Sequence, residues 1–174
     1  MAPRYNLSLG NDRFVQIVEW KGELGVDIRQ WEHEKPTTKG IRLTLMQFKN
    51  LTTGMDSSVS PAFATDDGTE SYRAIKDVSF HVGANVFVKV TKDNPCVDIR
   101  QYWKPPNQDD LVPTKKGLCL RPSEYKLFRE CVPDIEKSLP ELKNVIPCYM
   151  RDDHNNPLGM LSCDYCNPHD YFKW

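Results

Sequence analysis

The pentapeptide VDIRQ occurs twice in the chain, at Val26–Gln30 and again at Val97–Gln101. Each copy is followed by an aromatic residue, a variable loop, a Thr-x-Lys-Gly step and an alternation of apolar residues. The step and the alternation occupy Thr37–Leu43 after the first copy and Thr114–Leu120 after the second. A repeat of this kind predicts that each copy folds as a similar structural unit.

Segments that alternate apolar and polar residues with a period of two surround both copies, as expected of half-buried strands. Gly10 and Gly83 end the first such segment of each unit. Each unit is therefore expected to form four antiparallel strands. The expected strands are 5–9, 14–18, 26–30 and 39–43 in the first unit, and 78–83, 87–90, 96–101 and 116–120 in the second.

A helix is expected after the fourth strand of each unit. Thr44 is placed as an N-cap in the first unit, with Phe48 and Leu51 at helical spacing behind it. Pro122 suits the first position of the second helix, and Pro133 is expected to break or kink that helix. The class predicted is α+β, with two tandem four-stranded antiparallel sheets, each with one helix.

The two faces of each expected sheet differ in character. Val26 and Ile28 share one face of the third strand, whereas Asp27 and Arg29 share the other. One helix can cover only one face, so the face carrying Arg29 and its counterpart Arg100 is left open. A basic, aromatic-rich sheet face without a covering helix predicts a binding surface.

Composition divides the chain into four parts. Two repeats, at 1–55 and 78–145, flank an acidic Ser/Asp/Gly linker at 56–77, and an extension rich in Cys, His and aromatic residues follows at 146–174. The formal net charge of −1 argues against a strongly basic nucleic-acid binder, although both repeats are mildly basic. No apolar run approaches the roughly 20 residues that span a bilayer, and no secretory segment opens the chain, so an intracellular protein without a membrane partner is expected.

Several motifs in fixed order resemble the positive cofactor 4 family of small RNA polymerase II transcriptional coactivators, which bind single-stranded DNA. In the first unit they are Arg13–Gly22, the VDIRQ strand, and a Lys-Gly strand leading into a helix. In the second they are Ile99–Trp103 and Lys115–Gly117, followed by strand, proline and helix. The resemblance covers roughly residues 5–54 and 78–142.

The resemblance implies a fold, a ligand and a set of contact residues. Family members dimerise through helices and strands, so two fused modules imply an intramolecular pseudo-dimer in a monomeric chain. A unit of about 50 residues cannot build a sufficient core alone, which favours such pairing. The contacts implied are Arg13, Trp20, Lys21, Arg29 and Lys39 in the first module, and Lys92, Arg100, Trp103, Lys115 and Lys116 in the second.

The function implied is non-enzymatic binding of single-stranded DNA, in transcription or genome maintenance, with a nuclear location. Basic side chains would contact phosphates while aromatic rings stack on unpaired bases. RNA, melted duplex and the transcription machinery are further possible partners. Departures from the family are Glu32, which stands where the family has Trp, and Thr91, which stands where Trp20 sits in the first unit. Each half therefore lacks one stacking aromatic.

Simpler interpretations of the same residues stay open. Arg29 and Arg100 could form surface ion pairs with Asp27 and Asp98, and such pairs stabilise little. Edge-strand lysines could serve only to prevent aggregation. The alternative function is a structural or protein-interaction module that kept the fold without binding nucleic acid.

The extension at 146–174 has no counterpart in the family. Cys148, Cys163, Cys166 and His169 are candidate ligands of a structural zinc ion, because Cys-x-x-Cys-x-x-His offers tetrahedral donors. A single Cys-x-x-Cys is a weak signal, and an aromatic extension that packs on the modules is the alternative. No phosphate-binding glycine loop, nucleophile elbow or paired-carboxylate motif is present. We therefore expect no enzyme and no other cofactor, with a tail-centred zinc enzyme as a rival hypothesis.

Overall fold

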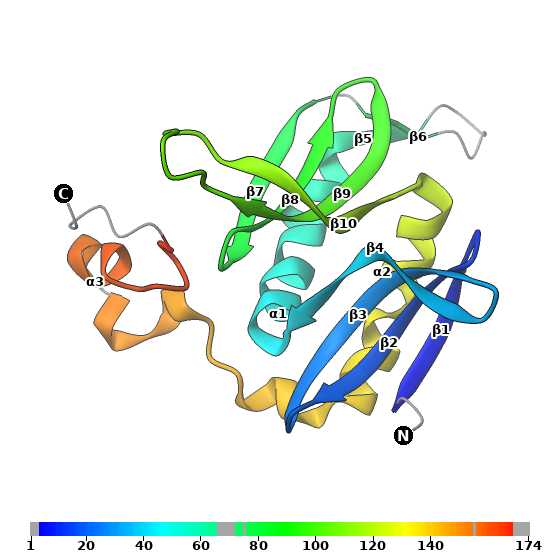
Figure 1. The fold of residues 1–174 in the computed structure, drawn as a ribbon, viewed down its shortest axis with the longest axis horizontal. Coiled ribbons are helices and arrows are strands. Elements are labelled where there is room, and N and C mark those ends of the chain that lie inside the picture. Colours follow the sequence, from blue (N-terminus) through cyan, green and yellow to red (C-terminus); the bar gives the residue numbers. More distant parts are fainter. Residues whose placement is uncertain (1–3, 66–71, 75, 155, 169–174) are drawn as a thin grey trace.

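Two four-stranded antiparallel sheets, one around each VDIRQ copy, form the framework of this computed structural model (Figure 1). It describes residues 4–65, 72–74, 76–154 and 156–168. The first sheet has the order β1 (Tyr5–Gly10), β2 (Arg13–Trp20), β3 (Glu23–Glu32) and β4 (Lys35–Thr44), and the second has β7 (Val78–Gly83), β8 (Val86–Thr91), β9 (Asn94–Trp103) and β10 (Val112–Leu120). The predicted α+β class and tandem sheets are confirmed.

Each sheet is followed by one helix, α1 (Leu45–Gly54) or α2 (Pro122–Ser138), that begins at equivalent positions. Gln47 Oε1 accepts a hydrogen bond from the backbone N–H of Thr44, and Glu124 Oε1 accepts the matching bond from Arg121. Pro133 was expected to break or kink α2, and it does not break the helix, which continues through this residue to Ser138. Ile135, two residues beyond the proline, is buried in the core, and this packing explains why the helix continues despite the lost backbone bond. We call β1–β4 with α1 module 1, and β7–β10 with α2 module 2.

The same cross-strand register builds the core of both modules. Ile28 of β3 lies between Val15 and Ile41, and Ile99 of β9 lies between Val88 and Leu118. All these side chains are buried. The predicted division of the third strand into an apolar and a polar face is confirmed, because Arg29 lies on the opposite face from Ile28 and is partly exposed.

Tight two-residue turns make the strands longer than the alternation indicated. His33 and Glu34, which were expected to lie in an open loop, have φ angles of 50° and 61° and connect β3 directly to β4. Such positive φ values at both positions are those of a type I′ hairpin turn. Neither residue is glycine or asparagine, so the usual sequence signal of this turn is missing.

Each helix packs against the first strand of the other module: α1 lies on β7 and α2 lies on β1. The buried apolar side chains of both modules belong to one continuous cluster. Strands β4 and β10 also lie side by side, at the centre of Figure 1. The two modules are thus joined by exchanged helix contacts on one side and adjoining strands on the other.

The stretch between the modules carries secondary structure of its own. Helix α1 continues into a π-helical turn, η1 (Met55–Val59), and a 3-10 turn, η2 (Ser60–Ala62), followed by a small hairpin of β5 (Phe63–Thr65) and β6 (Tyr72–Ala74). Val59, Ala62 and Ala74 are buried in the shared core. Part of the segment expected to be a linker is therefore packed against the modules.

The C-terminal extension, coloured orange in Figure 1, lies beside α1 and β7. A 3-10 turn, η3 (Pro140–Asn144), precedes the extension, whose described residues include η4 (Cys148–Met150), η5 (Asp152–His154) and a short helix, α3 (Pro157–Leu161). No helix among the described residues has the length and apolar character needed to cross a membrane.

Candidate nucleic-acid interface

Arg29 and Arg100 hold equivalent positions on the open faces of the two sheets. The guanidinium of Arg29 donates two hydrogen bonds to Asp27, each 3.1 Å long, and one of 2.7 Å to the carbonyl of Thr37. Arg100 bonds to Asp98 and donates a 2.8 Å bond to the carbonyl of Thr114. The ion pairs expected under the simpler interpretation are present. Because a guanidinium has five N–H donors, two on Arg29 remain beyond these three bonds.

A repeated turn in the following strand holds these arginines in place. Thr37 Oγ1 donates to the carbonyl of Gln30 at 2.7 Å and accepts from the N–H of Lys39 at 3.2 Å. Thr114, Gln101 and Lys116 repeat both bonds with the same lengths. Each arginine is therefore hydrogen-bonded to the threonine that lies two residues before a lysine of the predicted site.

Glycine follows each of these lysines because the central strand comes too close for a side chain. A Cβ on Gly40 would lie 2.7 Å from the carbonyl oxygen of Ile28 and from Cγ of Arg29. A Cβ on Gly117 would lie 2.6 Å from the carbonyl oxygen of Ile99. The Lys-Gly dipeptide of the repeat is thus explained by the space that the arginine and its strand require.

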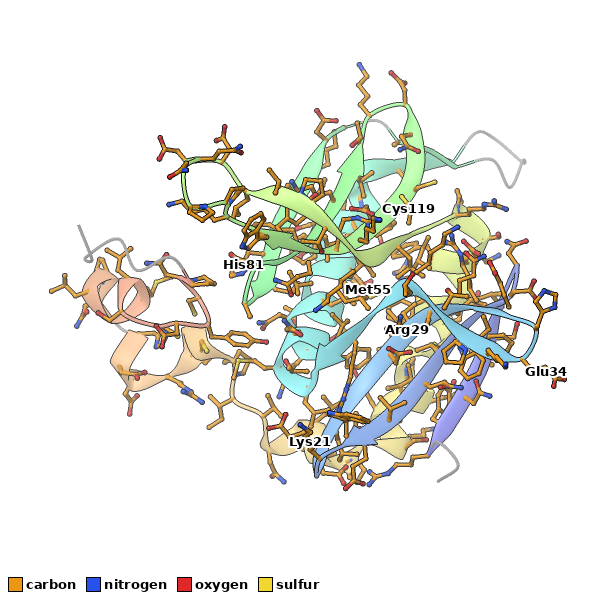
Figure 2. The ribbon with its side chains drawn as sticks, in the orientation of Figure 1. Lys21, Arg29, Glu34, Met55, His81 and Cys119 are labelled. Carbon is orange, nitrogen blue, oxygen red and sulfur yellow. The ribbon has the colours of Figure 1, made fainter. Side chains whose placement is uncertain are left out.

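Cations from both modules meet in a hollow of about 440 Å³ between β4 and β10. Arg29 and Arg42 line it from module 1, and Lys116 lines it from module 2. Figure 2 shows Arg29 near the place where the two strands approach each other. The other lining residues are Thr38, Gly40, Ile41 and Gln101. We call this the β4–β10 hollow; the charged side chains that line it are all cationic.

Two tryptophans of the predicted site present large apolar surfaces to solvent. Trp20, at the end of β2, is 63% exposed, and Trp103, at the end of β9, is 54% exposed. Trp31 instead packs edge-on against Phe14, with 6.1 Å between ring centroids. In module 2, Tyr102 packs edge-on against Phe87, the counterpart of Phe14. Trp20 and Trp103 are accordingly the two better placed for stacking on bases.

The remaining lysines of the predicted site are exposed but spread out. Lys21 lies at the tip of the β2–β3 hairpin, where Figure 2 labels it, with a φ of 51°. Lys92 lies in the β8–β9 turn, and its backbone N–H donates to Asp77 at 2.7 Å. Lys39 and Lys115 are exposed on β4 and β10. The structure thus brings Arg29 and Lys116 together, and leaves Lys21 and Lys92 on separate hairpin tips.

Arg13 lies at the contact between the modules. Its guanidinium forms an ion pair of 3.1 Å with Glu124 of α2 and also bonds to the carbonyl of Cys119. The side chain of Arg13 is 16% exposed and that of Glu124 is fully buried. This places Arg13 at a structural joint, away from the exposed tryptophans.

Two further cations, outside the set of predicted contacts, lie on the open faces. Arg42 stands directly opposite Asp27, and Lys89 stands directly opposite Asp98. Lys89 Nζ lies 4.2 Å from the ring centroid of Tyr102. Strand alternation could have predicted both. Arg42 lies two residues from the residue opposite Arg29, and Lys89 lies two residues from the residue opposite Arg100, so each shares a sheet face with that arginine.

Four metal-binding side chains gather in the C-terminal extension. The ligand atoms of Cys148, His154, Cys163 and Cys166 all lie within 4.8 Å of one another. Three of them, the cysteines, were predicted, whereas the predicted fourth ligand, His169, lies outside the described residues. His154 occupies the fourth position of this Cys₃His group, which is compatible with a zinc site.

Local hydrogen bonds favour the charged form of one thiol in this group. Burial alone would raise the pKa of Cys163, but the N–H groups of Cys166 and Tyr165 point at its sulfur and, with His154, lower the pKa to about 7. The thiolate is the form that binds metals.

Comparison with known protein families finds a match for both modules. The model of the family described as Transcriptional Coactivator p15 (PC4) matches residues 7–53 and 83–131, which together make up more than half of the chain. The two matched segments fall on the two modules, and each begins in a sheet and ends in or near a helix. No solved structure matches the chain.

Proposed function

The chain belongs to the transcriptional coactivator p15 (PC4) family, and from this premise we propose that its open sheet faces bind single-stranded DNA. The family implies coactivation of transcription and single-strand binding, and it is not a family of enzymes. The observation that carries the proposal is the β4–β10 hollow, in which Arg29 and Arg42 of one module face Lys116 of the other. A phosphodiester backbone would be gripped there by both modules at once.

The proposed contacts divide between phosphates and bases. Arg29 and Arg100 have fixed guanidinium groups, because each is held by an aspartate and a carbonyl oxygen. Fixed planar donors suit bidentate contact with phosphate oxygens. Trp20 and Trp103 would stack on unpaired bases, at about 1–3 kcal/mol for each base. The proposal does not depend on Arg13, whose charge is already paired with Glu124.

Because the two modules are unequal, a bound DNA strand would follow a preferred path across them. Module 1 offers Trp20 but has Glu32 at the position of Trp103, and module 2 offers Trp103 but has Thr91 at the position of Trp20. One exposed tryptophan per module supports binding of one strand that passes both modules. We further propose that a single chain suffices, since each module already supplies the helix contact that the other needs.

Low overall charge supports a second candidate, a protein-interaction module. The net charge is −1, and Asp27 and Asp98 partly neutralise the two central arginines. Such a protein would recruit the transcription machinery through its fold without a strong phosphate attraction. A nuclear location follows from either candidate.

The cofactor proposed is limited to the extension. A Cys₃His group offers four protein ligands, and a zinc site closed in this way is structural, because a catalytic site keeps a position open for water. We therefore propose no enzymatic activity for the tail, and no cofactor for the sheet faces.

Fluorescence anisotropy of the full chain with a labelled dT oligonucleotide tests the nucleic-acid proposal. We expect a single strand to bind at least about tenfold more tightly than duplex DNA of the same length, because stacking requires unpaired bases. The variant Arg100→Ala/Trp103→Ala should lose at least about tenfold in affinity, with circular dichroism confirming its fold. No binding by the wild-type chain would favour the protein-interaction candidate.

A further inference from the structure

We propose that one zinc ion, bound by Cys148, His154, Cys163 and Cys166, folds the C-terminal extension and docks it onto the contact between α1 and β7. The inference rests on the structural zinc proposed above and is independent of nucleic-acid binding by the sheets. Its two parts are a ligand set, with His154 as the nitrogen donor, and a docking contact made by Tyr165.

Two distances within the group match those expected around zinc, and all its ligand atoms lie within 4.8 Å of one another. With Zn–S bonds of about 2.3 Å and Zn–N bonds of about 2.0–2.1 Å, a tetrahedron has edges of about 3.8 Å between two sulfurs and about 3.6 Å between sulfur and nitrogen. The Cys163 and Cys148 sulfurs are 3.9 Å apart, and Cys166 Sγ is 3.5 Å from His154 Nε2. The sulfur separation is far too long for a disulfide, whose S–S bond is about 2.05 Å.

The histidine is oriented as a metal ligand. His154 Nδ1 lies 2.9 Å from a carboxylate oxygen of Asp153, and its Nε2 faces the sulfurs. A hydrogen bond from the far nitrogen to a carboxylate fixes the ring and its tautomer in many zinc sites. The His154 side chain is 2% exposed, although Asp153 beside it is largely exposed. Asp153 therefore acts as a positioning residue.

Hydrophobic burial alone does not explain why the extension is folded. None of the residues of α3 is buried, and Met150, Leu158 and Met160 are exposed. The ligands come from η4, η5 and the turn after α3, so one ion would tie together three segments that share little core. Metal binding commonly supplies the folding free energy of such small units.

Tyr165 joins the metal-binding turn to the body of the protein. Its carbonyl accepts a 2.9 Å hydrogen bond from the N–H of Ala84, and its hydroxyl lies 2.9 Å from Thr44 Oγ1, at the N-cap of α1. Its ring lies so close to Gly83 that a Cβ there would be 1.8 Å from a ring carbon. Tyr165 stands within the Cys163–Cys166 turn, so order at the metal is transmitted directly to this contact.

The docking site is the one of two related joints at which the described residues form no ion pair. At the α2–β1 joint, Arg13 pairs with buried Glu124. At the equivalent α1–β7 joint, Val86 replaces the arginine and Gln47 replaces the glutamate. There Gln47 donates a 2.9 Å bond to the carbonyl of Gly83, the residue that Tyr165 covers. The extension therefore packs on the joint that is held by this neutral hydrogen bond instead of an ion pair.

Metal analysis of the full chain, purified under reducing conditions and reconstituted with zinc, tests the ligand set. We expect one zinc per chain in the wild type, its loss in Cys163→Ser and His154→Ala, and its retention in His33→Ala, a control in the β3–β4 turn. Cobalt(II) in place of zinc should give the absorption of a tetrahedral thiolate site. Wild-type chain without stoichiometric zinc, or a Cys148–Cys163 disulfide found by mass spectrometry, would overturn the proposal. So would loss of zinc in His169→Ala together with its retention in His154→Ala.

Hydrogen exchange and limited proteolysis of the same samples test the docking. Chelation of zinc should raise exchange in the extension and at the β7–β8 turn, but not at the β1–β2 turn of module 1. Tyr165→Ala should keep its zinc and still show raised hydrogen exchange at the β7–β8 turn. Equal protection of this turn in the zinc-free and zinc-bound chains would contradict the docking. Oligonucleotide binding, measured in parallel, reports separately on the sheet faces, so failure of either proposal is recognised independently.

Discussion

Glu124 of helix α2 is fully buried and pairs with Arg13 of strand β2 at 3.1 Å, although 111 residues separate them. The second carboxylate oxygen of Glu124 accepts from Asn11 at 3.2 Å. The same carboxylate caps its own helix through the N–H of Arg121. A single side chain thereby begins α2 and fixes it to module 1.

Truncation at this joint should destabilise the whole chain. Arg13→Ala leaves a buried carboxylate without its cation, and we expect a loss of about 3 kcal/mol in the free energy of unfolding, at the low end of the usual range because Arg13 keeps some contact with water. Urea denaturation at pH 7 measures the effect. The matched control is Arg4→Ala, since Arg4 pairs with Glu141 with both side chains 41% exposed, and it should change stability little. Equal midpoints for the two variants would contradict the structural role of Arg13.

Removal of the exposed tryptophans should weaken DNA binding without unfolding the protein. Trp20→Ala and Trp103→Ala should each reduce affinity for a dT oligonucleotide by about 5- to 150-fold, the equivalent of about 1–3 kcal/mol of stacking. Leu127→Ala serves as the control, because Leu127 is an exposed apolar residue on α2. Affinities that match this control would exclude both tryptophans from the interface.

The stacking aromatic that module 1 lacks at residue 32 can be introduced by mutation. Glu32 stands in module 1 where Trp103 stands in module 2, so Glu32→Trp should tighten oligonucleotide binding by about fivefold or more through added stacking. Anisotropy measures the gain. Glu130→Trp, which makes the same change of charge at an exposed position of α2, should give a smaller effect. A gain of the same size in both variants would attribute it to charge alone.

Two cysteines outside the extension should resist alkylation. Burial raises the pKa of Cys131 to about 11, and burial together with the nearby Asp98 carboxylate raises the pKa of Cys119 to about 12. A higher pKa leaves less thiolate at pH 8, so modification by iodoacetamide should be at least about 100-fold slower in the native chain than in urea. Peptide mass spectrometry assigns each site. Modification of both thiols at the unfolded rate would contradict the burial.

The positioning role of Asp153 can be separated from ligation. Asp153→Asn should keep one zinc per chain but weaken zinc affinity by about 10- to 100-fold, because the carboxylate orients the His154 ring. Competition with a chromophoric chelator measures the affinity. Asp152→Asn is the control, because it makes the same substitution at the exposed neighbouring carboxylate. The zinc affinity of this variant should stay near that of the wild type.

Local alternation was sufficient to predict the sheets and their faces. The placement of Val26 and Ile28 inside and Arg29 outside depends only on the two-residue period of a strand with one face covered. The repeat then extended the same assignment to Arg100. These features depend on near neighbours in the sequence, which is why they could be read from it.

Features that depend on distant contacts could not be read in the same way. The guanidinium of Arg13 is paired with a glutamate of the other module. The chain stays helical beyond Gly54 as far as Val59, because the shared core buries this valine. His154 joins the cysteines only through the path of the short turns between them, so sequence spacing favoured His169. The alternation of β4 did contain the signal for Arg42, two residues after Gly40.

The salt dependence of oligonucleotide binding tests the shared surface most directly. Arg42 and Lys116 line the β4–β10 hollow from different modules, and among the described residues neither forms an ion pair. The slope of log affinity against log salt concentration changes by about 0.7 for each phosphate contact that a single strand loses. Arg42→Gln/Lys116→Gln should therefore bind more weakly, with a slope less steep by about 1.4.

The control has the same loss of charge on α2, in Lys126→Gln/Lys137→Gln, where both lysines are exposed. It should keep nearly the wild-type slope, because α2 covers the buried side of the sheets. If the hollow variant instead shares the slope and affinity of the wild type, the two modules do not grip a phosphate backbone between them, and the account of this protein as a single-strand binder fails at its centre.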